Sequence, residues 1–249
     1  MDDLKGKVGV VSGAARGIGK AIVKDLCQNG VKVAFSYRER TDLARDLINE
    51  VKNSGGEILS FMIDAADFKQ VSKMVKEVYR YFGKIDILVN NVGLSCGSPI
   101  WKMSEDEWDK VMLVNLKSFY NHIRNVVPIF IKQQEGKIIN ITSVLGLRGR
   151  VGQLNYALAK SILVGLTKTL ARELGRFNIN VNAVAPGYVE TEFQMENTPE
   201  IIRKIVLDEC AIKRLGKPED VANLVSFLCS DKASHITGEI IRVDAGQYI

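Results

Sequence analysis

Short runs of β-branched and other apolar residues alternate along this chain with longer segments of helical periodicity. The short runs predict strands, and the longer segments predict helices between them. The predicted strands are Val8–Val11, Val31–Phe35, Ile58–Ile63, Ile85–Val89, Lys137–Ile141, Ile179–Val184 and Ile240–Val243. Because strands that alternate with helices pair in parallel through right-handed crossovers, the pattern predicts an α/β fold.

The same pattern favours one domain. Helical segments lie between the strands, for example Ala21–Leu26, Leu43–Val51 and Val71–Phe82, and no internal repeat, low-complexity tract or Ser/Gly-rich linker interrupts them. We therefore expect residues 1–249 to form a single Rossmann-like domain, in which a doubly wound parallel sheet has helices on both faces.

Composition narrows the class of protein. The 249 residues are 46% hydrophobic, which is enough to bury a large core. The net charge of +5 is spread along the chain without a run of like charges, so we expect no nucleic-acid partner. The first residues are charged, and no segment approaches the roughly 20 apolar residues of a membrane span. We expect a cytoplasmic protein with no membrane partner.

Metal and disulfide chemistry are not indicated. The four cysteines are widely separated and form no C-x-x-C pair, and the only imidazoles are His122 and His235. Such spacing predicts neither a disulfide framework nor a metal site.

A glycine-rich segment joins the first strand to the first helix. After Ser12 it reads Gly13, Ala14, Ala15, Arg16, Gly17, Ile18, Gly19. Glycines let the backbone approach a pyrophosphate, and the free N–H groups at the positive end of the following helix favour its negative charge. The segment predicts a dinucleotide-binding loop. Its G-x-x-x-G-x-G spacing differs from the usual fingerprint, and a glycine-rich turn without a ligand is the alternative.

The residues after the second strand bear on the choice of dinucleotide. An acidic residue there would hold the ribose 2′-hydroxyl of NAD, but this chain has Ser36-Tyr37-Arg38. Arg38 and Arg16 could together flank a 2′-phosphate, because planar guanidinium groups suit bidentate contact with an oxyanion. Either arginine alone would be read as a surface charge. The pair favours NADP(H) over NAD(H).

Tyr156 and Lys160 are the candidate acid–base pair. They stand four residues apart at the start of a helical pattern, so their side chains share one face. A tyrosine with a pKa near 10 is a sluggish acid at neutral pH, and a positive charge about 4 Å away would lower that pKa by roughly three units. We therefore expect Lys160 to lower the pKa of Tyr156. Alone, this common spacing would be weak support for catalysis.

Two further polar residues accompany this pair. Ser143 follows the strand Lys137–Ile141, at the sheet edge where open α/β folds bind ligands, and its hydroxyl can polarise a substrate carbonyl. A serine there can equally be a turn residue or a helix cap. Asn115 lies inside an apolar helical run, where it is either a satisfied core amide or part of a water relay.

With these residues, the chain resembles the short-chain dehydrogenase/reductase family, of the kind that includes 3-oxoacyl-carrier-protein reductases. The resemblance covers essentially the whole length. The matching segments are Ser12 through Gly19, Asp64-Ala65, Asn90-Asn91-Val92-Gly93, the tetrad Asn115, Ser143, Tyr156 and Lys160, and Pro186-Gly187 with Thr191.

The resemblance implies further site roles. It places Asp64, with the adjoining Ala65, at the adenine, Asn90 at a ribose, and Val189 with Thr191 at the nicotinamide amide. It also implies that Lys160 contacts the ribose hydroxyls and that Gly93 belongs to the cofactor-binding set.

Three positions depart from the usual family pattern. Ser12 and Val92 stand where the family mostly has threonine and alanine, and neither change threatens the chemistry. The segment around Pro128 lacks the basic residue with which acyl-carrier-protein reductases often meet their acidic carrier, although Arg172 remains. This departure weakens the case for an acyl carrier protein as partner.

Two segments bear on assembly and substrate access. The helix that follows Tyr156 is apolar on more than one side, and Gly165 permits close approach, so we expect a homo-oligomer, a tetramer or a dimer. Burial of both sides within one subunit is the alternative. The mixed segment at about residues 188–213 has the character of a mobile substrate lid.

Together, these features predict an NADPH-dependent reductase of 3-oxoacyl thioesters, in which nicotinamide supplies the hydride and Tyr156 supplies the proton. A dehydrogenase of a steroid, polyol or other secondary alcohol would carry the same tetrad. A dinucleotide sensor without turnover is the alternative from a different class, because fold does not dictate function.

Overall fold

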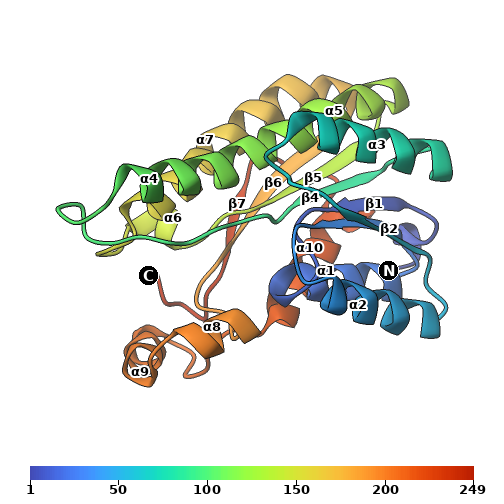
Figure 1. Cartoon of the computed structure of the whole chain (residues 1–249). Helices are drawn as coiled ribbons and strands as arrows, with labels where there is room; N and C mark the ends of the chain where they lie inside the picture. The colour runs from blue at the N-terminus through green and yellow to red at the C-terminus, as the bar shows by residue number, and fades with distance from the viewer.

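The computed structural model describes all residues, 1–249, and has the predicted sheet at its centre (Figure 1). Its seven strands are all parallel and are ordered β3-β2-β1-β4-β5-β6-β7. They are β1 (Val8–Val11), β2 (Lys32–Tyr37), β3 (Ile58–Met62), β4 (Ile87–Asn90), β5 (Gly136–Ile141), β6 (Ile179–Pro186) and β7 (Ile240–Val243). Every predicted strand is present; the bounds of β1 and β7 agree with the prediction, and those of the other five differ by one or two residues, as expected where ladders fray.

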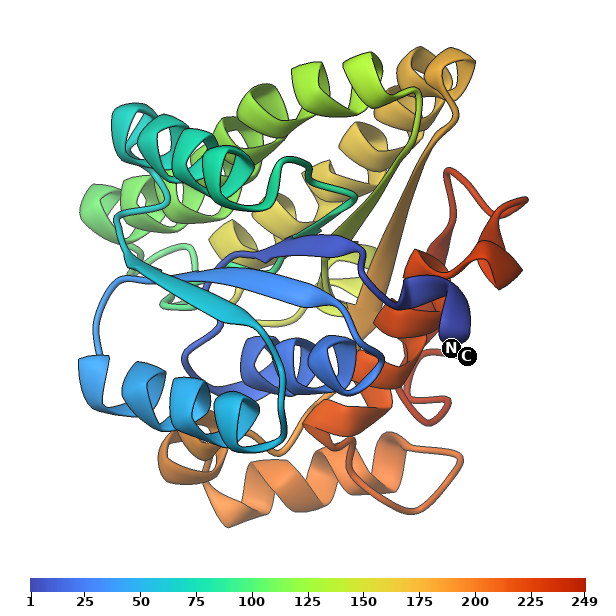
Figure 2. The same ribbon diagram turned by 90° about the vertical axis from the view of Figure 1, so that its right-hand side faces the viewer.

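Helices cover both faces of the sheet, which confirms the predicted Rossmann-like architecture (Figures 1 and 2). One face carries α1 (Gly17–Gln28), α2 (Thr41–Asn53) and α10 (Pro218–Cys229). The other carries α3 (Phe68–Phe82), α4 (Glu105–Met112), α5 (Ser118–Gln133) and α7 (Leu154–Leu174). The remaining α-helices are α6 (Leu145–Arg148), α8 (Glu192–Asn197) and α9 (Glu200–Glu209), of which α8 and α9 lie on the same side as α1 and α2.

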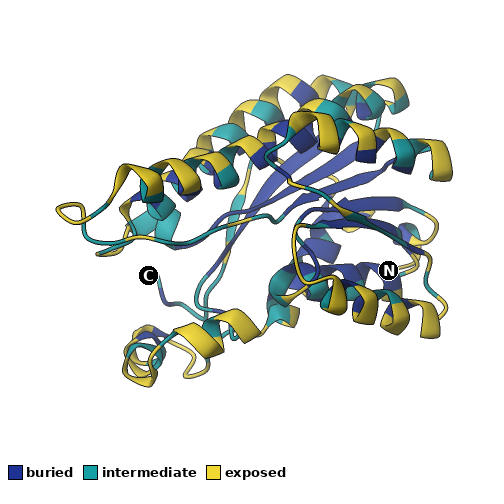
Figure 3. Cartoon of the chain, in the orientation of Figure 1, coloured by how far each residue is buried: buried dark blue, intermediate teal, exposed yellow.

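Strand side chains alternate between two hydrophobic cores. Val10, Leu88 and Ile138 pack toward α3, α5 and α7, whereas their neighbours Val11 and Val89 pack toward α1 and α10. Because both faces are covered, the central strands are apolar at nearly every position rather than at every second one. The central strands are accordingly buried, the edge strands β3 and β7 are partly buried, and most exposed helix residues lie on the outer surfaces (Figure 3).

A buried polar chain connects the centre of the sheet to α7. Asn90 in β4 donates from Nδ2 to Oδ1 of Asn140 in β5, at 3.0 Å, and Asn140 donates in turn to Oγ1 of Thr167, also at 3.0 Å. Such buried groups need partners, because an unpaired donor costs about 1–3 kcal/mol. The chain of amides therefore fixes how α7 lies across β4 and β5.

The strand order reverses between β1 and β4, since the chain proceeds outward from β1 to β3 and then resumes on the other side. In open parallel sheets the loops beyond the carboxyl ends diverge at such a point and leave a crevice for a ligand. The loops after β1 and β4 are those that contain Gly13 and Asn91.

Candidate active site

Two adjoining cavities lie along the carboxyl edge of the sheet. The first, of about 360 Å³, is bounded by the loop after β1 and by the ends of β2 and β3; we call it the loop cavity. The second, of about 610 Å³, is bounded by residues after β5 and β6, by the start of α7 and by α8; we call it the tyrosine cavity. Both share Ile18, Asn91, Gly93, Thr191 and Phe193, so a long ligand could extend from one into the other.

The loop after β1 packs too tightly for side chains at its glycines. Gly13 and Gly17 have positive φ angles of 66° and 57°. A Cβ on Gly19 would lie 2.6 Å from the carbonyl oxygen of Gly13 and 2.6 Å from Nδ2 of Asn91. Asn91 secures this arrangement by donating from Nδ2 to the carbonyl oxygens of Ser12 and Gly13.

The loop ends at a helix N-terminus with free donors. The first intrahelical bond of α1 runs from Lys20 N–H to the carbonyl oxygen of Arg16. The N–H groups of Gly17, Ile18 and Gly19 therefore have no intrahelical partner. They border the loop cavity, where the positive end of the helix dipole adds to their attraction for an anion. This cradle fits a pyrophosphate.

Most of the expected site residues line the cavities. The loop cavity is lined by Gly13, Ala15, Arg16, Gly17, Ile18, Gly19, Arg38, Asp64, Ala65, Gly93 and Thr191. The tyrosine cavity is lined by Ser143, Tyr156, Lys160, Val189, Gly93, Ile18 and Thr191. Three expected residues line neither: Ala14, Asn90 and Asn115.

Asn90 lies in the protein interior, and its neighbour Asn91 reaches both cavities. The Asn90 amide bonds to Asn140, and its Oδ1 has no hydrogen-bond partner. Ala14 is also buried, and its N–H donates to the carbonyl oxygen of Ser36 rather than into the loop cavity. The resemblance placed Asn90 at a ribose, but the structure brings the next residue of the same motif, Asn91, to the cavities instead.

Asn115 lies just outside the two cavities, where its side-chain amide joins two segments of the chain. It lies in a π-helical turn, Leu113–Lys117, between α4 and α5, a feature that often marks functional sites. Its Nδ2 donates to the carbonyl oxygens of Val111 and Leu94, at 2.8 Å each. The amide is therefore satisfied, and it ties the helix to the loop after β4.

Gly93 brings Asn115 and Lys160 together. A Cβ on Gly93 would lie 3.3 Å from Nζ of Lys160 and 3.4 Å from Oδ1 of Asn115. Both polar atoms thus approach the same point of the backbone, at the junction of the two cavities. Only a residue without a side chain leaves this space open.

Helix α7 presents Tyr156 and Lys160 from its first two turns. Asn155 anchors the helix start, since its Oδ1 accepts from the N–H of Tyr156 and its Nδ2 donates to the carbonyl oxygens of Cys96 and Glu107. The Lys160 Nζ donates to the carbonyl oxygen of Ile141, at 2.9 Å, and lies 5.7 Å from the centroid of the Tyr156 ring. The expected pair is therefore brought together, although the lysine bonds to β5.

The electrostatics of this pair differ from our expectation. Burial raises the pKa of Tyr156 to about 12, and the nearby Ser143 hydroxyl only partly opposes that shift. Burial also lowers the pKa of Lys160 to about 7, because the side chain is only 2% exposed and faces no carboxylate. The expectation that Lys160 would lower the pKa of Tyr156 is therefore wrong for the chain's own residues. Loss of hydration outweighs the attraction between the two groups.

Neighbouring side chains already contact both members of the expected arginine pair, Arg16 and Arg38. Arg38 and Arg16 both line the loop cavity, but the Arg38 guanidinium is paired with the Glu39 carboxylate at 2.7 Å. The Arg16 guanidinium lies over the ring of Phe193, 5.2 Å from its centroid. Arg40 also lines this cavity and pairs with Asp42. Sequence reasoning did not include Glu39 and Arg40, although both follow Arg38 directly.

The segment expected to form a lid contains α8 and α9. Tyr188, Phe193, Asn197 and Ile202 from this segment line the tyrosine cavity. Thr191 caps α8 by accepting from the N–H of Gln194. The segment thus forms one wall of the cavity, opposite the residues of β5 and α7.

No group of three or more His, Cys, Asp or Glu side chains could hold a metal ion. No helix combines the length and the apolar character needed to cross a membrane.

The fold and the paired cavities define a class: an α/β protein with a glycine-rich anion cradle in one cavity and a tyrosine, a serine and a lysine in the adjoining one. A family model described as enoyl-(acyl carrier protein) reductase matches residues 13–247. The chain belongs to the short-chain dehydrogenase/reductase family and is an NAD(P)-dependent oxidoreductase that acts on carbonyl or hydroxyl groups.

Within that family the chain is similar to 3-oxoacyl-[acyl-carrier-protein] reductases. It is 41% identical to the enzyme of Staphylococcus epidermidis over 243 residues, which is 98% of this chain and 99% of the relative. It is 41% identical to that of Thermotoga maritima over 246 residues, or 99% of each chain. A short-chain dehydrogenase/reductase of Serratia marcescens, solved as a double mutant, superposes with a TM-score of 0.92 at 36% identity, and the match covers 98% of this chain and 99% of that one.

The lowered pKa of Lys160 predicts a pH-dependent stability. Its pKa is about 7 when folded and 10.5 as the ordinary value, so between these limits the unfolded chain holds a proton that the folded chain has released. Stability from this group is therefore reduced at pH 7 and rises toward pH 10, by up to about 1.4 kcal/mol per pH unit. The free energy of unfolding of wild type and of Lys160→Met should be measured in urea at pH 7, 8 and 9. We expect wild type to gain stability relative to Lys160→Met as the pH rises. Parallel pH profiles would show that Lys160 keeps its charge in the folded protein.

Proposed function

We propose that this chain is an NADPH-dependent carbonyl reductase that acts on 3-oxoacyl thioesters. The observation that supports it most directly is that Ser143, Tyr156 and Lys160 border one cavity that opens into a cradle for a pyrophosphate. The similarity to 3-oxoacyl-[acyl-carrier-protein] reductases supports the substrate class.

A dinucleotide bound in the two cavities would supply the hydride. The free N–H groups of Gly17, Ile18 and Gly19 would hold its pyrophosphate. Asp64, which lines the loop cavity beside Ala65, would contact the adenine, and Val189 with Thr191 would contact the nicotinamide amide.

Tyr156 and Ser143 act on the substrate carbonyl. Ser143 donates a hydrogen bond that polarises the carbonyl oxygen, and the Tyr156 hydroxyl transfers its proton to that oxygen as the carbon accepts the hydride. The products are the 3-hydroxyacyl thioester, the oxidised dinucleotide and a phenolate that water reprotonates. Because burial keeps the pKa of Tyr156 well above neutral, the hydroxyl is protonated at pH 7, as a proton donor must be.

Lys160 and Asn115 position these groups. The Lys160 ammonium lies close to the backbone of Gly93 at the junction of the cavities, where it can hold the ribose hydroxyls. Asn115 fixes the adjoining loop through Leu94. The charge on Lys160 also stabilises the phenolate that forms on Tyr156 during reduction.

The preference for NADPH rests on the arginines of the loop cavity. Arg16 and Arg38 border it from two sides, with Arg40 beside them. Glu39 opposes this preference, because its carboxylate occupies the Arg38 guanidinium and repels a 2′-phosphate. Binding of NADPH therefore requires that Arg38 exchange its carboxylate partner for the phosphate.

We further propose that the chain forms a homo-oligomer through α7. Leu154, Leu158 and Ile162 are exposed on one side of this helix, while Leu163 and Ala171 are buried against the sheet on the other. A Cβ on Gly165 would meet no atom within 4 Å, so another helix has room to approach. A second copy of α7 covers this apolar stripe most simply, because a two-fold axis brings identical surfaces together.

Replacement of Tyr156 by Phe tests the reaction. We expect kcat for an acetoacetyl thioester to fall by about 10²- to 10⁴-fold, because the proton donor is lost. NADPH affinity should stay within a few-fold of wild type. Steady-state rates from nicotinamide absorbance, with NADPH binding by calorimetry, measure the two effects separately. A wild-type protein that binds NADPH but reduces no thioester, ketone or aldehyde would contradict the proposal.

Exchange of charges at the end of β2 tests the cofactor preference. Arg38→Asp should weaken NADPH relative to NADH by about tenfold or more, because it removes a charged hydrogen-bond donor from the 2′-phosphate. Glu39→Gln should change the ratio in the opposite direction. Dissociation constants for both dinucleotides, measured by calorimetry, provide the readout. An unchanged ratio in both variants would place the 2′-phosphate elsewhere.

A charge on the α7 stripe tests the oligomer. Wild type should sediment as a species heavier than the 27.6 kDa chain, and Leu158→Glu should shift it toward that mass, because a carboxylate cannot be buried unpaired in an apolar interface. Asn49→Glu, at an exposed position of α2 on the opposite face of the sheet, is the matched control and should leave the mass unchanged. Sedimentation of wild type as a single chain would reject the proposal.

A further inference from the structure

The tyrosine cavity has an uneven charge distribution. Among the side chains that line it, the charged groups are two cations, Lys160 and Arg150, and no aspartate or glutamate is present. Lys160 already has a partner in the carbonyl oxygen of Ile141 and belongs to the cofactor junction. Arg150 is left without a role in the reaction described above.

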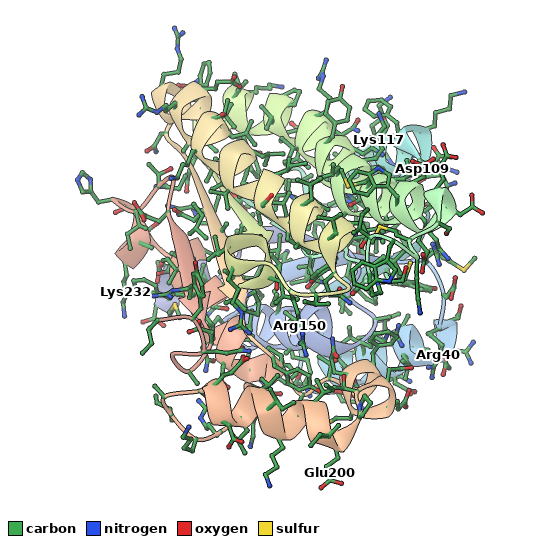
Figure 4. All side chains as sticks on the ribbon, turned by 90° about the vertical axis from the view of Figure 1, so that its left-hand side faces the viewer. Arg40, Asp109, Lys117, Arg150, Glu200 and Lys232 are labelled. Carbon is green, nitrogen blue, oxygen red and sulfur yellow. The ribbon has the colours of Figure 1, made fainter.

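Arg150 lies on the rim of this cavity. It is in the turn between α6 and α7, flanked by Gly149 and Gly152, both of which have positive φ angles. The adjacent Val151 also lines the cavity and is 85% exposed, which places this turn at the opening rather than at the floor. In Figure 4, Arg150 lies between the layer of α6 and α7 and the segment that contains α9.

No acidic side chain of the chain pairs with Arg150. Its neighbour Arg148 forms an ion pair with Glu209 at 2.6 Å, but Arg150 has no ion pair. Glu209 uses one oxygen, Oε2, for both Arg148 and Nε2 of Gln247, the latter at 2.9 Å. The hydrogen bonds from Gln247 and Arg148 lower the pKa of the Glu209 carboxyl, and the Arg150 charge adds to that shift. Because Arg150 forms neither an ion pair nor a hydrogen bond with Glu209, its donors remain available to a ligand.

We propose that Arg150 is a specificity-determining residue that binds an oxyanion of the substrate at the rim, while the carbonyl of the same molecule meets Tyr156. A planar guanidinium forms paired hydrogen bonds with either a carboxylate or a phosphate, so the chemistry it selects is a terminal oxyanion. In a 3-oxoacyl thioester the oxyanion is the phosphate of the carrier arm or a carboxylate at the far end of the acyl chain. This inference rests on the proposed carbonyl reduction.

Because no acidic residue lines the cavity, the preference of Arg150 for an anionic substrate is strengthened. A carboxylate in direct contact with Arg150 would neutralise it and repel an anionic substrate, but no side chain that lines the cavity carries a carboxylate. The charge acts before contact as well, because a cavity lined by one sign of charge raises the local concentration of the opposite ion. Neutral and anionic substrates should therefore differ more in KM than in kcat.

Three thioesters test the proposal. The neutral reference is the N-acetylcysteamine thioester of 3-oxoadipate monomethyl ester, the carboxylate probe is the same thioester with the free acid, and the phosphate probe is acetoacetyl-CoA. Wild type should show a lower KM for at least one anionic probe than for the neutral one. Arg150→Gln should raise that KM by about tenfold or more and leave the neutral substrate within about twofold, because only the charged hydrogen bonds are lost. Arg150→Lys should restore part of the effect.

The outcomes separate this inference from the proposed function. A wild type that reduces none of the three substrates fails the proposed function itself. If wild type reduces them all and Arg150→Gln changes none, or slows all three alike, Arg150 has no part in specificity and the inference is overturned. A KM change with one anionic probe alone identifies whether the oxyanion is a carboxylate or a phosphate. Lys168→Gln removes an exposed charge from α7 outside the cavity and should behave as wild type.

Discussion

The buried amino group of Lys160 is the constraint around which the rest of the site is arranged. Taking this group out of water is costly, which lowers its pKa to about 7, and the only hydrogen bond that the chain offers in return is the one to the carbonyl oxygen of Ile141. That bond requires β5 to end where it does and α7 to pass directly over its end. Gly93 adds no side chain that would block this group, and Oδ1 of Asn115 approaches the same point of the Gly93 backbone. The burial of Lys160 lowers the stability of the fold, which agrees with its proposed role in holding the ribose of the cofactor.

The sequence predicted the fold well because its information is local. Buried parallel strands leave continuous apolar runs, and Gly13, Gly17 and Gly19 lie where a strand becomes a helix. The sequence also placed Ser143, Tyr156 and Lys160 at one edge of the sheet, where they line one cavity, since strand ends and helix starts determine where such side chains meet; Asn115 lines neither cavity. These features depend on few residues, and each can be read from the chain without knowing its neighbours in space.

What the sequence did not show depends on contacts between distant segments. The pKa of Tyr156 follows from burial, which no local pattern reports. Glu39 takes up the Arg38 guanidinium, and Phe193 of α8 covers Arg16, so neither arginine is as free as its position suggested. Likewise, only the packing of the loop after β4 decides that Asn91 faces the cavities while Asn90 faces the core. In each case an expectation based on residue type lacked the partner that modifies it.

The π-helical turn at Leu113–Lys117 constrains the number of residues that can connect α4 to α5. A π turn accommodates one residue more than an α turn, so α4 and α5 form one helical path whose two halves differ in rotational phase by about 100°. Deletion of one residue within this turn would restore a regular helix and bring the halves into phase. The amide of Asn115 would then rotate away from Leu94, and the buried faces of α4 and α5 could not both point at the core. A change of length in this turn should therefore disturb both helices, whereas a substitution that keeps the length leaves their register unchanged.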